Sequence, residues 1–92
     1  MYNYPFSQTD ENLIRMVWNK GKIANGYNPE FWRKDIFGFF MHFPDHGNTN
    51  SEYGWEIDHI IPSSKGGSDN LSNLQPLFWK NNRYKGDNYP YI

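Results

Sequence analysis

The sequence predicts one small domain of the α+β class, and three observations carry this prediction. The chain has 92 residues, enough for a single hydrophobic core and too few for a second folded unit, so we expect residues 1–92 to form one domain. Residues 9–20 have the apolar spacing of an amphipathic helix. Two apolar runs, at residues 55–61 and 71–78, have the length of strands and precede a short helical segment at residues 79–86.

Composition limits what can stabilise such a domain. Hydrophobic residues make up 37% of the chain and aromatic residues 20%, so the core should consist of few but large side chains. Cysteine is absent, which excludes both a disulfide framework and a thiolate zinc site. The net charge of −1 does not indicate an anionic polymer as partner. With no membrane-spanning apolar run and no signal-peptide pattern, we expect a soluble cytoplasmic protein without a membrane partner.

The first half of the chain is predicted to contain one helix and an aromatic-rich segment. Thr9 is the expected N-cap of the helix and Gly21 its end. The buried stripe along this helix should consist of Leu13, Ile14, Val17 and Trp18. Asn-Gly and Asn-Pro turn signals then indicate short strands or a short helix around residues 29–35. We expect residues 37–43 to pair with residues 55–61 across a polar loop.

The second half should fold as two strands with a helix lying across them. Pro76 cannot donate a ladder hydrogen bond, so the second strand must be short or at an edge. Such a ββα unit brings Asp58 of the first strand close to Asn82 of the helix. Asp58 and His59 are consecutive, and consecutive residues of a regular strand point to opposite faces. We therefore expect the strand to end near Asp58, with Asn73 holding the following loop by hydrogen bonds to its backbone.

Residues 56–87, EIDHIIPSSKGGSDNLSNLQPLFWKNNRYKGD, resemble the motif of HNH endonucleases, a ββα-metal unit. The pieces DHIIP, GGSDNLSNLQ and NNRYKGD occur in the order and spacing of that family, within a motif core at residues 55–87. Upstream, VWNKGKI and GYNPEFWRKDIFG are similar to a Cys-free bacterial and phage subgroup. The resemblance implies metal-dependent hydrolysis of DNA phosphodiester bonds, by nicking or double-strand cleavage, with 5′-phosphate and 3′-hydroxyl products.

The resemblance also implies a role for each polar residue of the motif. His59 corresponds to the general base, Asp58 and Asn82 to the metal ligands, and Asn73 to the structural middle residue. These residue types suit the chemistry, because an imidazole with a pKa of about 6.5 can accept a proton from water near neutral pH. Carboxylate and amide oxygens favour one divalent ion, with Mg²⁺ ahead of Mn²⁺ or another divalent metal.

No structural zinc is expected in this chain. Many HNH proteins hold such a zinc with two Cys pairs, and the corresponding positions near the helix are Phe78 and Asn81. The N-terminal helix and the aromatic-rich segment would have to stabilise the ββα unit by packing instead, with Phe78 as part of that packing. The four tryptophans are accordingly expected in the core and not as platforms for bases.

Basic residues near the motif are candidate phosphate contacts. This set consists of Lys80, Arg83, Lys85, Arg33 and Lys34. The alternative interpretation is that the first three only complement the C-terminus of the helix. A second cluster of titratable residues, His42, Asp45 and His46, is interpreted as a surface turn and not as a metal site.

Two alternative functions remain open at this level. One is a nucleic-acid-binding or interaction module with a degenerate HNH fold, which the near-neutral charge favours. The other is a ribonuclease or toxin-like effector that uses the same centre on RNA. The expected partner is DNA, with RNA as the alternative, and a homodimer or a partner protein would be needed for double-strand or sequence-specific cleavage.

Overall fold

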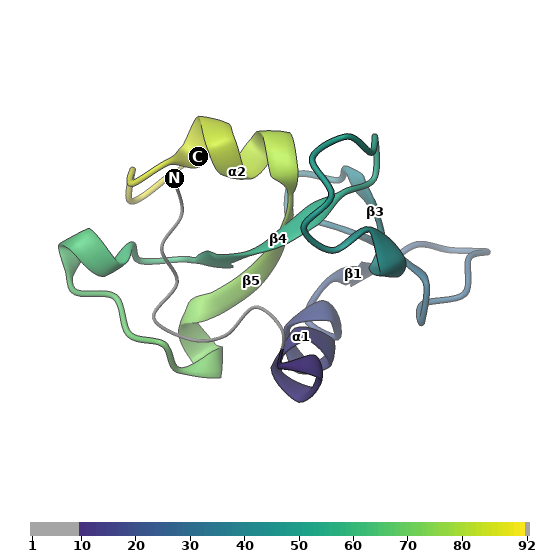
Figure 1. Ribbon diagram of the computed structural model, residues 1–92, viewed down its shortest axis with the longest axis horizontal. Helices are drawn as coiled ribbons and strands as arrows, with labels where there is room; N and C mark the ends of the chain where they lie inside the picture. Colours follow the sequence, from purple (N-terminus) through teal and green to yellow (C-terminus); the bar gives the residue numbers. More distant parts are fainter. Residues whose placement is uncertain (1–9, 92) are drawn as a thin grey trace.

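The computed structural model describes residues 10–91 of the chain and confirms the α+β class (Figure 1). Its helices and strands, in chain order, are α1 (Glu11–Trp18), β1 (Lys22–Ile23), β2 (Trp32–Lys34), β3 (Phe40–His42), β4 (Trp55–His59), β5 (Leu74–Phe78) and α2 (Trp79–Lys85), with short 3₁₀ turns η1 (Phe43–Asp45), η2 (Ser63–Lys65) and η3 (Leu71–Asn73). The strands form a three-stranded sheet, β1-β2-β3, and a separate hairpin of β4 and β5. Neither described helix has the length and apolar character needed to cross a membrane.

Helix α1 forms where the apolar spacing predicted it. Its cap is Asp10, whose carboxylate accepts hydrogen bonds from the N–H groups of Asn12 and Leu13, whereas Thr9 lies outside the described residues. The helix ends at Trp18, two residues earlier than expected. The buried residues Ile14, Val17 and Trp18 confirm the predicted stripe.

The three-stranded sheet differs from the predicted pairing. Strand β3 pairs with β2 and not with β4, and the segment after β3 meets β4 at an isolated bridge between His46 and Trp55. The reason lies in the turn after β2. The Asp35 carboxylate accepts hydrogen bonds from the N–H groups of Phe37 and Phe39, which closes a tight β2–β3 hairpin and occupies the backbone of the segment that was expected to reach β4.

The β4–β5 hairpin and α2 form the predicted ββα unit. Pro76 lies opposite Ile57 in a sheet of only two strands, so the missing N–H can face an open edge. Helix α2 ends at Lys85, and Gly86 follows with a φ of 52°, a conformation that favours glycine.

The hairpin lies between the two helices, with α1 on one side and α2 on the other (Figure 1). The core on the α1 side combines aliphatic side chains with aromatic rings, and Trp18 packs against Trp55 with ring centroids 5.0 Å apart. Trp32 and Trp79 are only half-buried, so two of the four tryptophans are not fully in the core.

A buried carboxylate connects the aromatic segment to the ββα unit. Asp35 is 1% exposed, and its second oxygen accepts hydrogen bonds from the Phe78 N–H at 3.1 Å and from the Asn81 amide at 2.8 Å. These are the two positions at which the resemblance places cysteines in other HNH proteins. Phe78 is itself buried and stacks on Phe39. The start of α2 is therefore held by hydrogen bonds and aromatic packing.

Candidate functional site

The predicted site residues lie at the end of strand β4 and on helix α2. Strands β4 and β5 pair from Trp55 opposite Phe78 to His59 opposite Leu74. The ladder even continues beyond the strand, because the Ile60 N–H donates to the Asn73 carbonyl at 2.8 Å. Strand β4 ends at His59, one residue after Asp58, so both residues still belong to the strand and point to opposite faces of β4.

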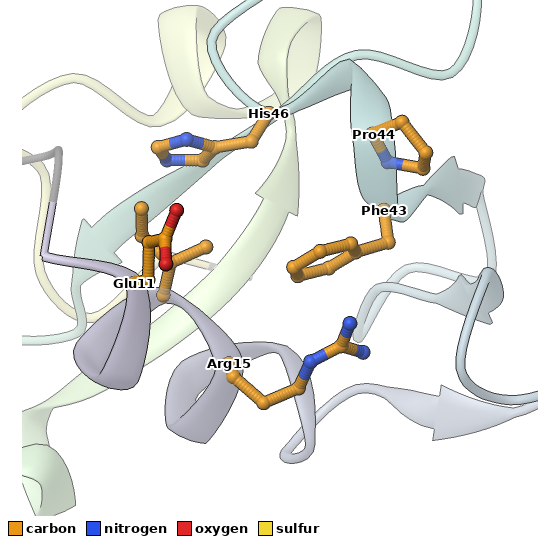
Figure 2. A pocket seen from close by; sticks show the side chains of 6 residues that line it. Glu11, Arg15, Phe43, Pro44 and His46 are labelled. Carbon is orange, nitrogen blue, oxygen red and sulfur yellow. The ribbon is translucent and has the colours of Figure 1, made fainter.

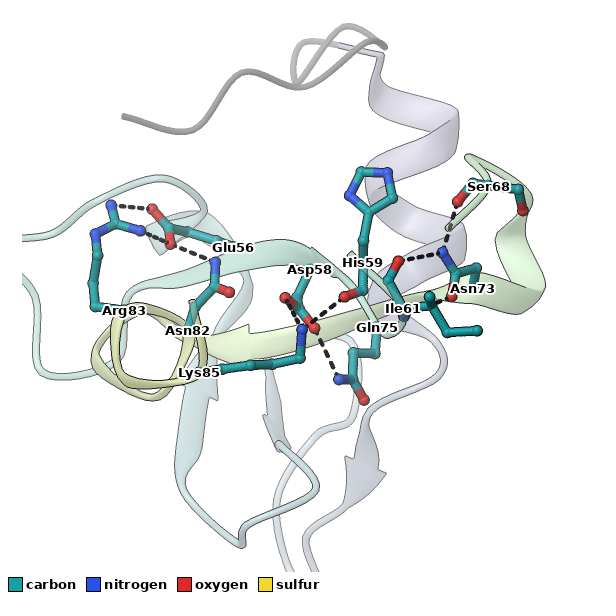
Figure 3. A network of polar contacts seen from close by, with 10 residues as sticks. All are labelled: Glu56, Asp58, His59, Ile61, Ser68, Asn73, Gln75, Asn82, Arg83 and Lys85. Atoms are coloured by element: carbon teal, nitrogen blue, oxygen red, sulfur yellow. Dashed lines mark hydrogen bonds and ion pairs between the residues drawn. The ribbon is translucent and has the colours of Figure 1, made fainter. Parts of the chain in front are cut away.

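Asp58 faces α2 and is fully buried. One of its carboxylate oxygens accepts a hydrogen bond from the Gln75 amide at 3.0 Å, and the other is 3.2 Å from the Lys85 ammonium (Figure 3). Burial raises the pKa of the Asp58 carboxyl, while the hydrogen bond from Gln75 and the charge of Lys85 act in the opposite direction. Lys85 is also anchored by the main-chain carbonyl of His59 at 2.8 Å.

Asn82 is fully buried on the same side of the hairpin, and Glu56 sets the orientation of its amide. The Asn82 amide nitrogen donates to Glu56 at 2.9 Å, and Glu56 is held in turn by two hydrogen bonds from Arg83, at 2.6 and 2.8 Å. A carboxylate can accept but not donate, so the nitrogen of the amide must face it. The Asn82 carbonyl oxygen is thereby directed away from Glu56 and toward Asp58 in the view of Figure 3.

His59 is 5% exposed and lies toward the loop that connects the two strands. Its Nε2 is 2.7 Å from a carboxylate oxygen of Asp69 in that loop. A carboxylate at this distance restrains the orientation of the ring.

Asn73 holds the same loop together, as expected for a structural middle residue. Its side-chain oxygen accepts from the Ile61 N–H, and its amide nitrogen donates to the carbonyl groups of Ile61 and Ser68 (Figure 3). The loop passes so close that a Cβ at Gly67 would lie 1.7 Å from the Ile61 carbonyl oxygen, a position open only to glycine. The polar loop is therefore a defined structure next to His59.

The basic residues expected to contact phosphate do not form one surface. Lys85 is buried, and its ammonium is directed at the Asp58 carboxylate, because a buried carboxylate must be paired with a cation. Arg33 donates to three main-chain carbonyl oxygens, and Arg83 pairs with Glu56. Lys34 and Lys80 lie over the rings of Phe40 and Trp79 respectively.

Glu56, Gln75 and Asp69 also belong to this site, although they were not predicted from the sequence. Two of them carried a signal, because Glu56 is two residues before Asp58 and so shares its strand face, and Gln75 is its cross-strand partner. The contact between Asp69 and His59 spans ten residues of loop and had no periodic signal.

The donor set near α2 fits a hard divalent ion. Asp58 offers carboxylate oxygens and Asn82 an oriented amide oxygen, which are ligands that Mg²⁺ accepts. Within residues 10–91, no three His, Cys, Asp or Glu side chains cluster tightly enough to hold a metal among themselves. An ion held here would therefore use one carboxylate and one amide from the protein, with water and phosphate oxygens as its remaining ligands.

A separate hollow lies on the other side of the hairpin. It has a volume of about 540 Å³ and opens between α1 and η1 (Figure 2). Its walls are formed by Glu11, Ile14, Arg15, Phe43, Pro44 and His46. Arg15 lies over the Phe43 ring, with the guanidinium carbon 3.6 Å from the ring centroid. None of the site residues on α2 or at the end of β4 contributes to this hollow.

Comparison with known proteins assigns the family. Residues 42–88, more than half of the 92-residue chain, match the family described as HNH endonuclease. The chain therefore belongs to the HNH endonuclease family, a class of nucleases. The matched residues contain β4, β5, α2 and all four predicted catalytic residues, whereas α1, β1 and β2 lie outside the match. Neither a curated protein nor a solved structure matches the chain.

Proposed function

We propose that the protein is a metal-dependent endonuclease that hydrolyses DNA phosphodiester bonds, by nicking or by double-strand cleavage, and leaves 5′-phosphate and 3′-hydroxyl ends. One observation carries this proposal. The Glu56–Arg83 pair orients the Asn82 amide so that its oxygen and the Asp58 carboxylate lie on the same side of the hairpin, beneath α2. An amide oriented in this way by a second residue is typical of a metal ligand, whose oxygen must point at the ion.

In this proposal, His59 takes a proton from the attacking water. Asp69, 2.7 Å from Nε2, stabilises the imidazolium that results and keeps the ring in place. Since His59 is the last residue of β4, a phosphate that lies across the end of the strand can approach both His59 and the Asp58 side of the hairpin. Asn73 keeps the adjoining loop, and so Asp69, in position.

Asp58 and Asn82 would hold one Mg²⁺, with Mn²⁺ as a substitute. When bound, the ion supplies charge that stabilises the phosphate and the departing 3′ oxygen. Lys85 remains next to Asp58 through its contact with the His59 carbonyl, and its charge favours the ionised carboxylate that a cation requires.

A second candidate is a nucleic-acid-binding module without activity. The observation in its favour is the Lys85–Asp58 ion pair, in which an ammonium group already neutralises the carboxylate that would bind the metal. A third candidate, cleavage of RNA by the same centre, differs only in substrate.

The decisive experiment is the incubation of supercoiled plasmid with the wild-type chain in Mg²⁺, in Mn²⁺ and in EDTA. We expect metal-dependent nicking that His59→Ala lowers at least about 100-fold, the usual contribution of a general base. His46→Ala serves as the matched control, because it removes a histidine from the other side of the hairpin. Thermal unfolding establishes that both variants fold.

Three outcomes would contradict the proposal. Plasmid binding without cleavage in either metal would favour the binding module. Cleavage of a labelled RNA with intact plasmid would favour the ribonuclease. Equal cleavage by wild type and His59→Ala would exclude His59 as the base.

A further inference from the structure

The three-stranded sheet has one face turned toward the core and one turned away from it. Met41 in the middle of β3 is fully buried in the core, so its neighbours Phe40 and His42 point to the opposite face. The strand register places Trp32 beside His42 and Lys34 beside Phe40 on that same outward face. The alternation of the strands thus displays aromatic rings where a surface sheet usually displays polar side chains.

Two tyrosines from flanking loops extend this row of rings. The Tyr53 ring lies 5.2 Å from Trp32, and the Tyr27 ring lies 5.0 Å from Phe40. We call the set Tyr27, Trp32, Phe40, His42 and Tyr53 the aromatic outer face. Tyr27 is 50% exposed and Tyr53 39% exposed, while the other three are half-buried. Exposed rings in contact with one another are unusual on a small monomer and mark a binding surface.

Positive charge accompanies these rings. The Lys34 ammonium lies over the Phe40 ring, 5.0 Å from its centroid. Lys22 is the register partner of Lys34 and so belongs to the same face of the sheet. The Asp45 carboxylate, which contacts the face through His42, is engaged by His42 at 3.3 Å and by Ser51 at 2.8 Å. The Lys22 and Lys34 end of the face is therefore complementary to an anion.

We propose that the aromatic outer face binds single-stranded nucleic acid, with bases stacked on its rings and phosphates near Lys22 and Lys34. Stacked aromatic side chains next to cations are the means by which proteins hold single strands without reading their sequence. The inference rests on the proposed nuclease function for its choice of ligand and assigns the substrate contact to a part of the chain largely outside residues 42–88. A single strand fits better than a duplex, since the bases of a duplex are already stacked on each other.

The loop between η1 and β4 connects this face with α2. The Tyr53 carbonyl accepts a hydrogen bond from the His42 N–H of β3, and the Ser51 carbonyl accepts one from the Trp79 ring nitrogen at the start of α2. A shallow groove of about 180 Å³ lies between this loop and the helix, with Lys80 in its wall. In Figure 1 the loop occupies the space between β3 and the beginning of α2. A single-stranded nucleic acid that leaves the aromatic outer face past Tyr53 thus reaches helix α2, which carries Asn82.

The test measures binding separately from cleavage. Fluorescence anisotropy of a labelled oligothymidylate of about 12 nucleotides is recorded with the intact chain in EDTA, next to oligouridylate and duplex DNA of equal length. Tyr27→Ser and Tyr53→Ser should each weaken binding about tenfold, because each removes one stacking surface. Tyr27→Phe keeps the ring and should keep the affinity. Lys34→Gln should lower the slope of log affinity against log salt by about 0.7, the value for one phosphate contact on a single strand.

Ile23→Ser is the matched control, because Ile23 is 67% exposed on the opposite face of the same sheet. It should bind like the wild type, and the thermal unfolding midpoint of each variant establishes that it is folded. If one tyrosine variant does not fold, the other and Lys34→Gln still test the proposal.

Several results would overturn the inference. Wild-type affinity in both tyrosine variants would do so, as would tighter binding of duplex than of single strands. A dimer in sedimentation that Tyr27→Ser dissociates, without any oligonucleotide binding, would identify the face as an interface between copies. If the wild-type chain cleaves plasmid and the variants bind oligonucleotide as it does, this inference fails and the proposed endonuclease function stands. If the wild-type chain does not cleave plasmid but the variants lose oligonucleotide binding, the endonuclease proposal fails and this inference stands.

Discussion

The ββα unit and the three-stranded sheet solve the problem of a small core in opposite ways. Of the seven buried polar or charged side chains in the described part of the chain, six lie between Asp58 and Lys85, and only Asp35 lies elsewhere. The three-stranded sheet instead leaves aromatic rings partly exposed. Burial of polar groups and exposure of rings both cost stability, so each region departs from the arrangement that folding alone would favour.

This contrast indicates where function constrains the chain. A buried carboxylate is tolerated only when it is paired, and Asp58 has both Gln75 and Lys85 as partners. Such networks cost free energy because their groups lose contact with water, and removal of one member leaves the others without hydrogen-bond partners. Local departures from folding rules gather at functional sites, and here they gather at the site residues of the HNH motif and on the aromatic outer face.

The largest effect is expected for Lys85→Met, which tests the buried pair. Removal of the ammonium leaves the Asp58 carboxylate buried without its cation, and we expect a loss of about 3–5 kcal/mol in the free energy of unfolding. Urea unfolding in EDTA measures this loss. Lys80→Met, on the exposed side of the same helix, should change the free energy by about 0.5 kcal/mol or less. Equal losses in the two variants would contradict the contrast between a buried and a surface lysine.

Asp35→Ala tests the connection between the two regions. It removes four hydrogen-bond acceptor contacts at once, two in the β2–β3 turn and two at the start of α2, and should lower the free energy of unfolding by about 3 kcal/mol. Asp45→Ala is the control, since Asp45 is half-buried and its carboxylate contacts His42 and Ser51, which are both close to it in sequence. A smaller loss for Asp35→Ala than for Asp45→Ala would show that α2 does not depend on this carboxylate.

Glu56→Ala sharpens the comparison at the proposed metal ligand. Without Glu56 the Asn82 amide is no longer oriented, and the affinity for Mn²⁺ in calorimetric titration should fall about tenfold or more. Arg83→Gln keeps the Glu56–Asn82 hydrogen bond but removes the two hydrogen bonds that hold Glu56, so it should lower the affinity less than Glu56→Ala does. Unchanged Mn²⁺ binding in Glu56→Ala would mean that Asn82 needs no such support.

The smallest effect concerns pH and the histidine outside the site. Burial lowers the pKa of His46, although the charge of Glu56 acts in the opposite direction. Near pH 6.5 the unfolded chain therefore binds a proton at His46 more readily than the folded chain does. As the pH falls below about 6.5, His46 thus lowers the stability of the folded protein. His46→Gln should lose less stability than the wild type between pH 7 and pH 5, measured by urea midpoints. A steeper loss in His46→Gln would reverse the sign of the argument.

Features that depend on neighbouring residues along the chain were predictable. The stripe of Ile14, Val17 and Trp18 predicted α1, and the order of strand, loop, strand and helix predicted the ββα unit. The contacts of Asn73 with its loop were also predictable, because asparagine commonly hydrogen-bonds backbone groups of the loop that it borders. The spacing of the HNH motif carried the family assignment in the same way.

Features that depend on contacts between residues far apart in the sequence were not predictable. The Asp35 carboxylate closes the β2–β3 hairpin, so β3 pairs with β2 instead of β4. It also accepts a hydrogen bond at the start of α2, 43 residues away, and no periodic pattern in the sequence indicates such a contact. Whether Lys85 faces a phosphate or a buried carboxylate, and which face of β2 and β3 meets the core, depend on what packs against each surface. The sequence by itself determined the periods and the chemistry of the side chains, whereas the tertiary structure decided their partners, because the free energy of a buried charge or ring is set by the atoms around it.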